Sequence, residues 1–142
     1  MRYESVFNIR TFHTDAFGHV NNARYLEILE EARWQYAEEI GLIELLRASE
    51  LGFIIMDLRI QFRRPVTEGD SICVQTQLIT LGTASGEVLQ TVNQSHEKNV
   101  ATRCLSHFIL IERDSGRSVP IDGRIRELLD EVIEPERSSV RR

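Results

Sequence analysis

Hydrophobic residues recur with a helical period in the first third of the chain. Between residues 23 and 40 they return every three or four positions, and most glutamates fall off that face. Gly41 follows as a helix stop. The pattern predicts a long amphipathic helix with an apolar face made of Leu26, Leu29, Ala32, Tyr36, Ala37 and Ile40. A second, short helix is expected over residues 42–51, ending at Gly52.

Beyond Gly52 the pattern changes to the two-residue period of strands. Residues 53–62 alternate, which places Ile54, Met56, Leu58, Ile60 and Phe62 on one predicted face. Turn residues separate three further expected strands, near 71–81, 86–95 and 100–111. A first short strand is expected at residues 3–11 and a closing helix at 122–134.

This order of elements predicts an α+β fold in which a five-stranded antiparallel sheet wraps one long central helix, with a helix at the C-terminal end. We expect a single domain over residues 1–134 and a flexible polar tail over 135–142. Such a sheet keeps an uncovered edge and outer face, which commonly lead to association. The fold therefore predicts a homo-oligomer, either a homodimer or a homotetramer.

Composition narrows the classes of partner. With 142 residues, a formal charge of -5 and a pI near 5.4, the chain offers no overall field that attracts nucleic acid or an anionic membrane. Its two cysteines, Cys73 and Cys104, lie in apolar runs, as expected for buried thiols in a reducing compartment. No signal-peptide or membrane-spanning pattern is evident, so we expect a cytoplasmic protein.

Candidate chemistry is concentrated just before the long helix. Asp15 lies in a turn, and the helix is expected to begin at Asn21 or Asn22. Read locally, these are an ordinary turn residue and an ordinary N-cap. The N–H groups of a first helical turn also stabilise an oxyanion without a metal, so a thioester carbonyl near Asn22 would be open to attack by water activated by Asp15, or by Asp15 itself. Gly18 lets the loop turn tightly.

Longer motifs resemble a known family. They are His13-x-Asp15, the run from His19 to Glu27 (HVNNARYLE), the run from Leu29 to Trp34 (LEEARW), Arg63-Arg64-Pro65 and Gly69-Asp70. The chain resembles hotdog-fold acyl-CoA thioesterases of the 4-hydroxybenzoyl-CoA thioesterase type over about residues 5–132, and especially the bacterial long-chain acyl-CoA thioesterase III group.

The resemblance implies a hotdog fold and hydrolysis of acyl-CoA, with substrate bound across a subunit interface. It further implies that Asp15 is the catalytic carboxylate and that the Asn22 backbone N–H polarises the thioester carbonyl. Coenzyme A would enter as part of the substrate, with no separate cofactor. The 4-hydroxybenzoyl branch has proline after its aspartate and an aromatic residue at the Asn22 position. Ala16 and Asn22 therefore favour a medium- to long-chain fatty acyl group.

Three arginines are candidate ligands for the phosphates of coenzyme A. Arg63 and Arg64 end a predicted strand, and Arg59 lies on its polar face. Guanidinium groups suit phosphate, although a solvated strand end explains the same residues. His19 and Val20 complete the predicted substrate-binding set. His19 flanks Asp15 and could orient it, or could simply be a surface residue.

Three further residues are candidates for positioning the site rather than forming it. His13 could orient Asp15, or could simply be a surface residue. Arg33 falls on the apolar face of the long helix, where an ion pair with Glu30 would compensate its charge; alternatively, Glu30 assists the attacking water. No spacing of His, Cys or carboxylate residues matches a metal site, so none is predicted.

Two other functions remain open from the sequence. The same fold could hydrolyse thioesters carried by acyl-carrier protein, which would need a basic outer patch. It could also be a non-catalytic acyl-CoA-binding module, against which the presence of Asp15 argues. A related-fold dehydratase is disfavoured, because no histidine and acid are paired for its proton chemistry.

Overall fold

In the computed structural model, which describes residues 1–137, a curved antiparallel sheet covers one long helix. The strands are β1 (Arg2–Asn8), β2 (Leu51–Phe62), β3 (Ser71–Leu81), β4 (Ser85–Gln94) and β5 (Val100–Glu112). The helices are α1 (Asn22–Glu39), α2 (Leu42–Ser49) and α3 (Gly123–Val132), with a 3-10 turn, η1 (Thr11–His13), after β1. The predicted α+β hotdog fold is confirmed.

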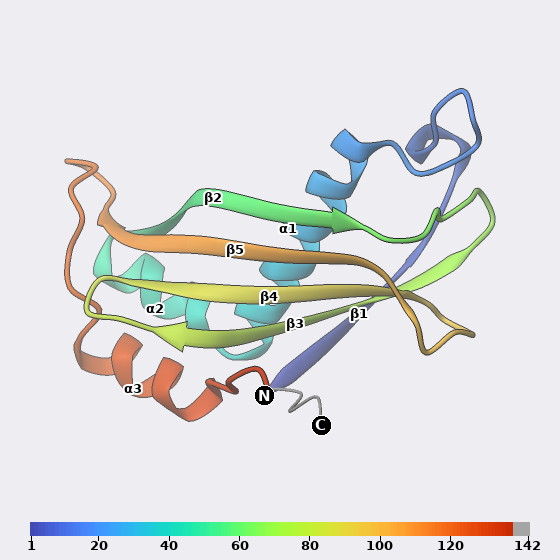
Figure 1. The fold of residues 1–142 in the computed structure, drawn as a ribbon. Coiled ribbons are helices and arrows are strands. Elements are labelled where there is room, and N and C mark those ends of the chain that lie inside the picture. The colour runs from blue at the N-terminus through green and yellow to red at the C-terminus, as the bar shows by residue number, and fades with distance from the viewer. Residues whose placement is uncertain (138–142) are drawn as a thin grey trace.

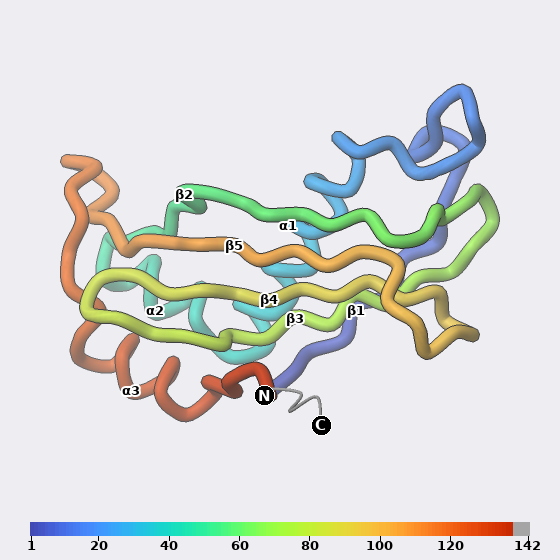
Figure 2. The backbone as a smooth tube through the Cα atoms, viewed as in Figure 1, coloured from blue at the N-terminus to red at the C-terminus, as the bar shows by residue number. Residues whose placement is uncertain are grey.

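The sheet has the order β1-β3-β4-β5-β2, and all neighbours are antiparallel. Strands β3, β4 and β5 are consecutive in the chain and adjacent in the sheet, so they form an antiparallel meander. The pairing of β1 with β3 and of β2 with β5 leaves β1 and β2 as the two edges. Helix α1 lies behind the sheet in Figure 1, and α3 lies beside its lower margin. The tube in Figure 2 shows the loop between β1 and α1 at one corner of the molecule, at the far end of the sheet from α2.

Helix α1 buries a face slightly different from the predicted one. Leu29, Ala32 and Tyr36 are buried as predicted, and Tyr25 and Ile28 join them. Leu26 remains 43% exposed. The sheet covers only the stripe that contains Tyr25 and Leu29, so the side of the helix that carries Leu26 stays open.

Strand β2 departs most from its predicted pattern. Ile55 pairs with Phe108 and Asp57 pairs with His107, so Met56 is an extra residue in a bulge. A one-residue insertion exchanges the two faces of a strand. Before the bulge, Ile55 packs on the core, and after it Ile60 does, while Ile54 is exposed. The prediction that residues 54, 56, 58, 60 and 62 share one face is therefore wrong.

The turn between α2 and β2 also differs from the prediction. Helix α2 ends at Ser49, where Glu50 adopts a left-handed conformation with φ of 54°. Gly52 is not the helix stop; it already belongs to β2.

Two clusters of buried side chains form the core. One joins the N-terminal half of α1 to the sheet around Leu29 and Val74. The other joins α2 and α3 to the sheet around Leu46, Phe108 and Leu129. After α3, Glu136 forms an ion pair with Arg103. Residues 138–142 of the predicted flexible tail lie outside the described residues. None of the helices in residues 1–137 is long and apolar enough to span a bilayer.

Candidate active site

The loop before α1 holds the carboxylate of Asp15 by its own backbone. Asp15 Oδ1 accepts hydrogen bonds from the N–H groups of Phe17, at 2.9 Å, and His19, at 3.3 Å. The N–H of Asp15 donates to the carbonyl of His19 at 2.8 Å, and Gly18 closes the turn with φ of 76°. Within residues 1–137, Oδ2 of Asp15 accepts no hydrogen bond, so one carboxylate oxygen is fixed and the other is available.

Asn21, rather than Asn22, caps the helix. Its side-chain oxygen accepts a hydrogen bond from the N–H of Ala23 at 2.8 Å, and Asn22 is the first helical residue. The N–H of Asn22 has no protein acceptor in the described chain. An unpaired N–H at a helix start carries the positive end of the helix dipole, so it is a ready oxyanion donor.

A second loop supports this one. Val20 N–H donates to the carbonyl of Val66 at 2.8 Å, and His19 bridges to Thr67. Asp70 braces the second loop by accepting hydrogen bonds from Thr67 N–H and from the Gln94 amide, each at 2.8 Å. Burial alone would raise the pKa of Asp70, but these bonds and one from the Thr67 hydroxyl hold the pKa below its ordinary value.

Both loops and the start of α1 enclose a cavity of about 260 Å³, here called the loop cavity. Six of the predicted site residues line it: Asp15, His19, Val20, Asn22, Arg63 and Arg64. They come from segments more than forty positions apart in the sequence, and the docking of the two loops brings them together. Gly18 shapes the turn without lining the cavity.

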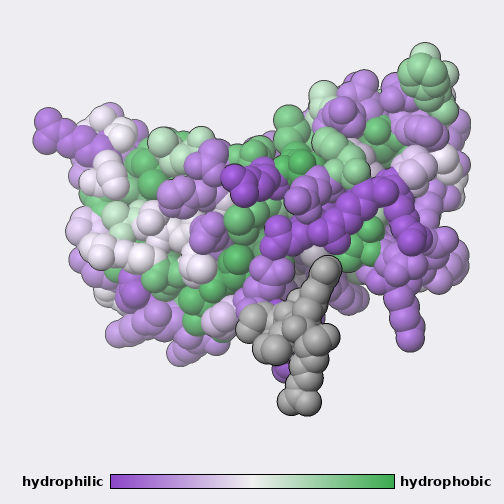
Figure 3. All heavy atoms as spheres, viewed as in Figure 1, coloured by the Kyte–Doolittle hydropathy of each residue, from purple (hydrophilic) through white to green (hydrophobic). Residues whose placement is uncertain are grey.

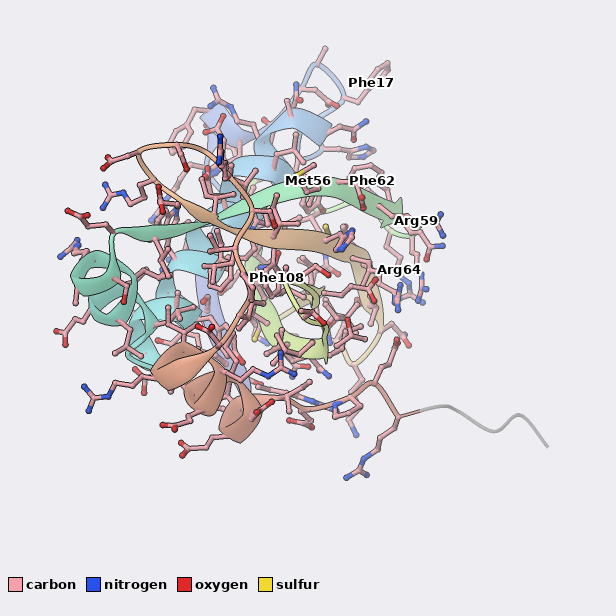
Figure 4. The ribbon with its side chains drawn as sticks, turned by 90° about the vertical axis from the view of Figure 1, so that its left-hand side faces the viewer. Phe17, Met56, Arg59, Phe62, Arg64 and Phe108 are labelled. Atoms are coloured by element: carbon pink, nitrogen blue, oxygen red, sulfur yellow. The ribbon has the colours of Figure 1, made fainter. Side chains whose placement is uncertain are left out.

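Arginines at the mouth of the loop cavity differ in how they are held. Arg63 donates to Gln61 at 3.0 Å, and Arg64 forms an ion pair with Glu97 at 3.2 Å. Arg59 does not line the cavity, although Figure 4 shows it on the same side of the molecule as Arg64. All three side chains are exposed, so each is accessible to a phosphate group.

Sequence reasoning missed part of the apolar wall. Tyr25 and Phe62 line the loop cavity and pack ring to ring, with centroids 5.4 Å apart. Burial raises the pKa of Tyr25, and its hydroxyl lies near Thr102 without a hydrogen-bond partner in the described residues. Both residues carried a usable signal, since Tyr25 lies four residues before Leu29 on the helix and Phe62 was placed on an apolar strand face.

The three predicted positioning residues lie elsewhere. His13 Nδ1 accepts a hydrogen bond from the N–H of Arg10 at 2.8 Å, so His13 belongs to the η1 turn. Glu30 and Arg33 line a different, larger space between α1, α2 and the sheet, of about 470 Å³ and here called the helix cavity. The predicted ion pair between Glu30 and Arg33 is not formed; Arg33 Nη1 donates to Gln90 Oε1 at 3.1 Å instead.

The arrangement is suited to acyl transfer without a metal. An available carboxylate oxygen and an unpaired helical N–H line the same small cavity, which supplies a base or nucleophile and an oxyanion donor. Among residues 1–137, no three His, Cys, Asp or Glu side chains form a cluster that could hold a metal ion.

Known proteins are similar to this chain over most of its length. The sequence model of the thioesterase-like superfamily matches residues 9–129. The long-chain acyl-CoA thioesterase FadM of Escherichia coli is 32% identical over 130 residues, which cover 92% of this chain and 98% of FadM. The crystal structure of YbaW, a probable thioesterase from Escherichia coli, superposes with a TM-score of 0.85 at 31% identity, covering 92% of this chain and 98% of that one.

A more distant structure shares the fold. SAV2348 from Staphylococcus aureus, solved in complex with CoA, has a TM-score of 0.83 at 11% identity and covers 92% of this chain and 83% of its own. Together with the match over most of the sequence, these results show that the chain belongs to the thioesterase-like superfamily and is a thioester hydrolase of the hotdog fold.

Proposed function

We propose that this protein hydrolyses medium- to long-chain fatty acyl-CoA to the free acid and coenzyme A. The observation that carries the proposal is the placement of Asp15 and the unpaired Asn22 N–H on one cavity. The similarity to FadM supports acyl-CoA as the substrate class.

In the proposed reaction, the thioester carbonyl accepts a hydrogen bond from the Asn22 N–H, which stabilises the charge that develops on oxygen. Asp15 Oδ2 takes a proton from water as the water oxygen attacks the carbonyl carbon, and collapse of the intermediate releases the coenzyme A thiolate. In the alternative route, Oδ2 itself attacks and water then hydrolyses the acyl–Asp15 anhydride. Label found in Asp15 after a single turnover in ¹⁸O-water would establish the second route, because it enters Asp15 only when water attacks the Asp15 carbonyl carbon of the anhydride.

The phosphates of coenzyme A are assigned to Arg63 and Arg64 at the mouth of the loop cavity, with Arg59 farther along β2. Guanidinium groups bind phosphate in bidentate geometry, which suits this role in a chain of net charge -5. The complex of SAV2348 with CoA supports a coenzyme A site on this fold.

Thiol release by wild-type and Asp15→Asn protein tests the proposal. Wild-type rates on acyl-CoAs of two to eighteen carbons, on benzoyl-CoA and on dodecanoyl-acyl-carrier protein should be highest with medium to long acyl-CoA chains. Asp15→Asn should lower kcat by about 10²- to 10⁴-fold, the usual contribution of a general base. Turnover equal to wild type would contradict the role of Asp15. Faster cleavage of the carrier-protein substrate would support the acyl-carrier-protein alternative, and binding without thiol release would support a binding module.

We further propose that two copies of this chain associate through the edge of β2. That edge is unpaired in the described residues and carries exposed apolar side chains, including Met56 at 57%. The space-filling view in Figure 3 shows the upper margin of the molecule, where β2 lies, hollowed between two projecting corners. A second copy pairing β2 with β2 would cover this edge.

Sedimentation of two lysine variants tests the association. Met56→Lys places a charge on the β2 edge and should shift the protein toward the monomer. Val6→Lys is the matched control, because Val6 is 65% exposed on β1, the opposite edge of the sheet. If Val6→Lys dissociates the oligomer and Met56→Lys does not, the contact between the copies lies at the β1 edge instead.

A further inference from the structure

The helix cavity is not used by the proposed reaction, yet it is larger than the loop cavity. Its walls are mostly apolar and come from α1, α2, α3 and the inner face of the sheet. Figure 4 shows Phe108, one of these wall residues, in the interior of the molecule below β2. A volume of about 470 Å³ is in the range of sites that bind small apolar ligands.

The charged residues of the helix cavity are mainly basic. Arg33, Arg47 and Arg113 line it, together with one carboxylate, Glu30. This local excess of positive charge contrasts with the net charge of -5 of the whole chain. Apolar walls with cationic groups match a ligand that has a hydrocarbon chain and an anionic head.

Arg33 is the cationic group best placed to bind such a head. Its Nη1 donates to the side chain of Gln90, which is fully buried and held in turn by Leu29 and Thr76. In residues 1–137 no carboxylate lies within 4.0 Å of the Arg33 guanidinium. A guanidinium has five N–H donors, so most of those of Arg33 have no acceptor among the protein residues that the structure describes. Burial also lowers the pKa of Arg33 below its ordinary value, although the negative charge of Glu30 opposes this shift.

Arg47 and Arg113 differ from Arg33 in exposure. Both are exposed to solvent, whereas Arg33 is mostly shielded beside the buried Gln90. A charge-assisted hydrogen bond is worth more where water is excluded. The head group is therefore assigned to Arg33, and the chain to the apolar walls around Phe108 and Leu46.

We propose that the helix cavity binds a free long-chain carboxylate, with its head group on Arg33. The choice of this ligand rests on the proposed function, which releases a carboxylate of that class. The site is separate from the reacting thioester, because Arg33 follows Asn22 by eleven helical residues, about 16 Å along α1.

Trp34 provides the measurement. It is the single tryptophan of the chain, lines the helix cavity and is 51% exposed, so its fluorescence reports a ligand there. Full-length protein is titrated with sodium dodecanoate below its micellar concentration, and with dodecanol as a neutral probe of the same chain length. We expect saturable binding of dodecanoate and binding of dodecanol that is weaker by roughly tenfold or more, because the alcohol lacks the charge that strengthens a hydrogen bond to Arg33.

Two variants that remove one positive charge each locate the head group. Arg33→Met should raise the Kd for dodecanoate by roughly 10- to 100-fold and leave the Kd for dodecanol within twofold. Arg47→Met, the matched control on the exposed rim, should change neither by more than twofold. Arg33→Lys keeps the charge and should retain part of the affinity, which excludes misfolding as the cause. Equal binding of dodecanoate and dodecanol, or an effect of Arg47→Met as large as that of Arg33→Met, would overturn the proposal.

Asp15→Asn separates this site from the loop cavity. Dodecanoate affinity should be unchanged in that variant, because Asp15 does not line the helix cavity. Tighter binding would place the carboxylate beside Asp15, where loss of a negative charge removes repulsion, and would overturn the proposal. If Arg33→Met instead changes sedimentation while dodecanoate binding is unaltered, Arg33 serves contact between two copies. Because binding is read without hydrolysis, a failure of the proposed thioesterase activity would leave this result interpretable.

Discussion

The loop cavity and the helix cavity lie along the same helix, but their charges are held in different ways. In the loop cavity, backbone N–H groups fix Asp15, and Arg64 is paired with Glu97. In the helix cavity, Arg33 is shielded and bound only through Gln90 among the described residues. The first cavity offers a carboxylate and a helical N–H, which suit bond breaking. The second offers a hydrocarbon surface and one cation that is shielded from solvent, Arg33, which suit binding.

Asn22→Pro should produce the largest contrast between the cavities. Proline is tolerated as the first helical residue, and Asn21 before it is already extended, with φ of -62° and ψ of 137°. The substitution therefore removes the proposed oxyanion donor and little else. We expect kcat to fall by about 10²- to 10³-fold, with dodecanoate binding unchanged.

Asn22→Ala is the control, since it keeps the N–H and should retain nearly full activity. Equal thiol-release rates for the proline and alanine variants would show that this N–H does not act on the carbonyl. Thermal unfolding of both variants checks that the helix start is intact.

Gly86→Ala should disturb the helix cavity and spare the loop cavity. A Cβ at this position would lie 2.5 Å from a ring carbon of Phe108 and 2.7 Å from the carbonyl oxygen of Thr80. Phe108 must then move, which should lower the free energy of unfolding by about 1–3 kcal/mol in urea titrations and weaken dodecanoate binding.

The matched control for Gly86→Ala is Gly52→Ala. Gly52 lines the helix cavity, and a Cβ added there would lie 3.7 Å from a side-chain carbon of Arg113, an ordinary contact distance. If Gly52→Ala destabilises the protein as much as Gly86→Ala, close packing on Phe108 is not the cause.

Asn21→Ala should weaken the helix start by a smaller amount. The variant loses the bond to Ala23 N–H, which should lower the free energy of unfolding by about 1 kcal/mol. The catalytic rate should fall as well, because the cap orients the first turn of α1. A loss of stability as large in Asn22→Ala would assign the cap to Asn22.

Asp70→Asn should have the smallest effect, and the effect should depend on pH. The hydrogen bonds to Asp70 hold its pKa below the ordinary value of 3.8, so the unfolded chain binds a proton more readily than the folded one. The resulting stabilisation is present above pH 3.8 and is lost as pH falls through the lower folded pKa. Urea unfolding of wild type and Asp70→Asn should differ at pH 6 and converge toward pH 3. A constant difference would show that the carboxylate charge is not responsible.

The sequence determined most of the fold and the polar half of the loop cavity. The apolar period of residues 23–40, with Gly41 after it, was sufficient to place α1 within one residue at each end, because helices bury one face. Asp15 and Asn22, which line this cavity, could be named as candidates because turn and helix-start residues act on nearby backbone. Such interactions are local, so they are readable from neighbouring positions.

Tertiary structure decided what depends on contacts between distant segments. The bulge at Met56 exchanges the two faces of β2 at that point. The register of β2 is set by its pairing with β5, so the alternation of its own sequence does not reveal the bulge. Arg33 donates a hydrogen bond to Gln90, fifty-seven positions later in the sequence, and forms no ion pair with Glu30 on the preceding turn of the helix. The partner of a shielded arginine depends on which strand packs against its helix. The sequence of α1 alone does not show that this strand is β4, which carries Gln90.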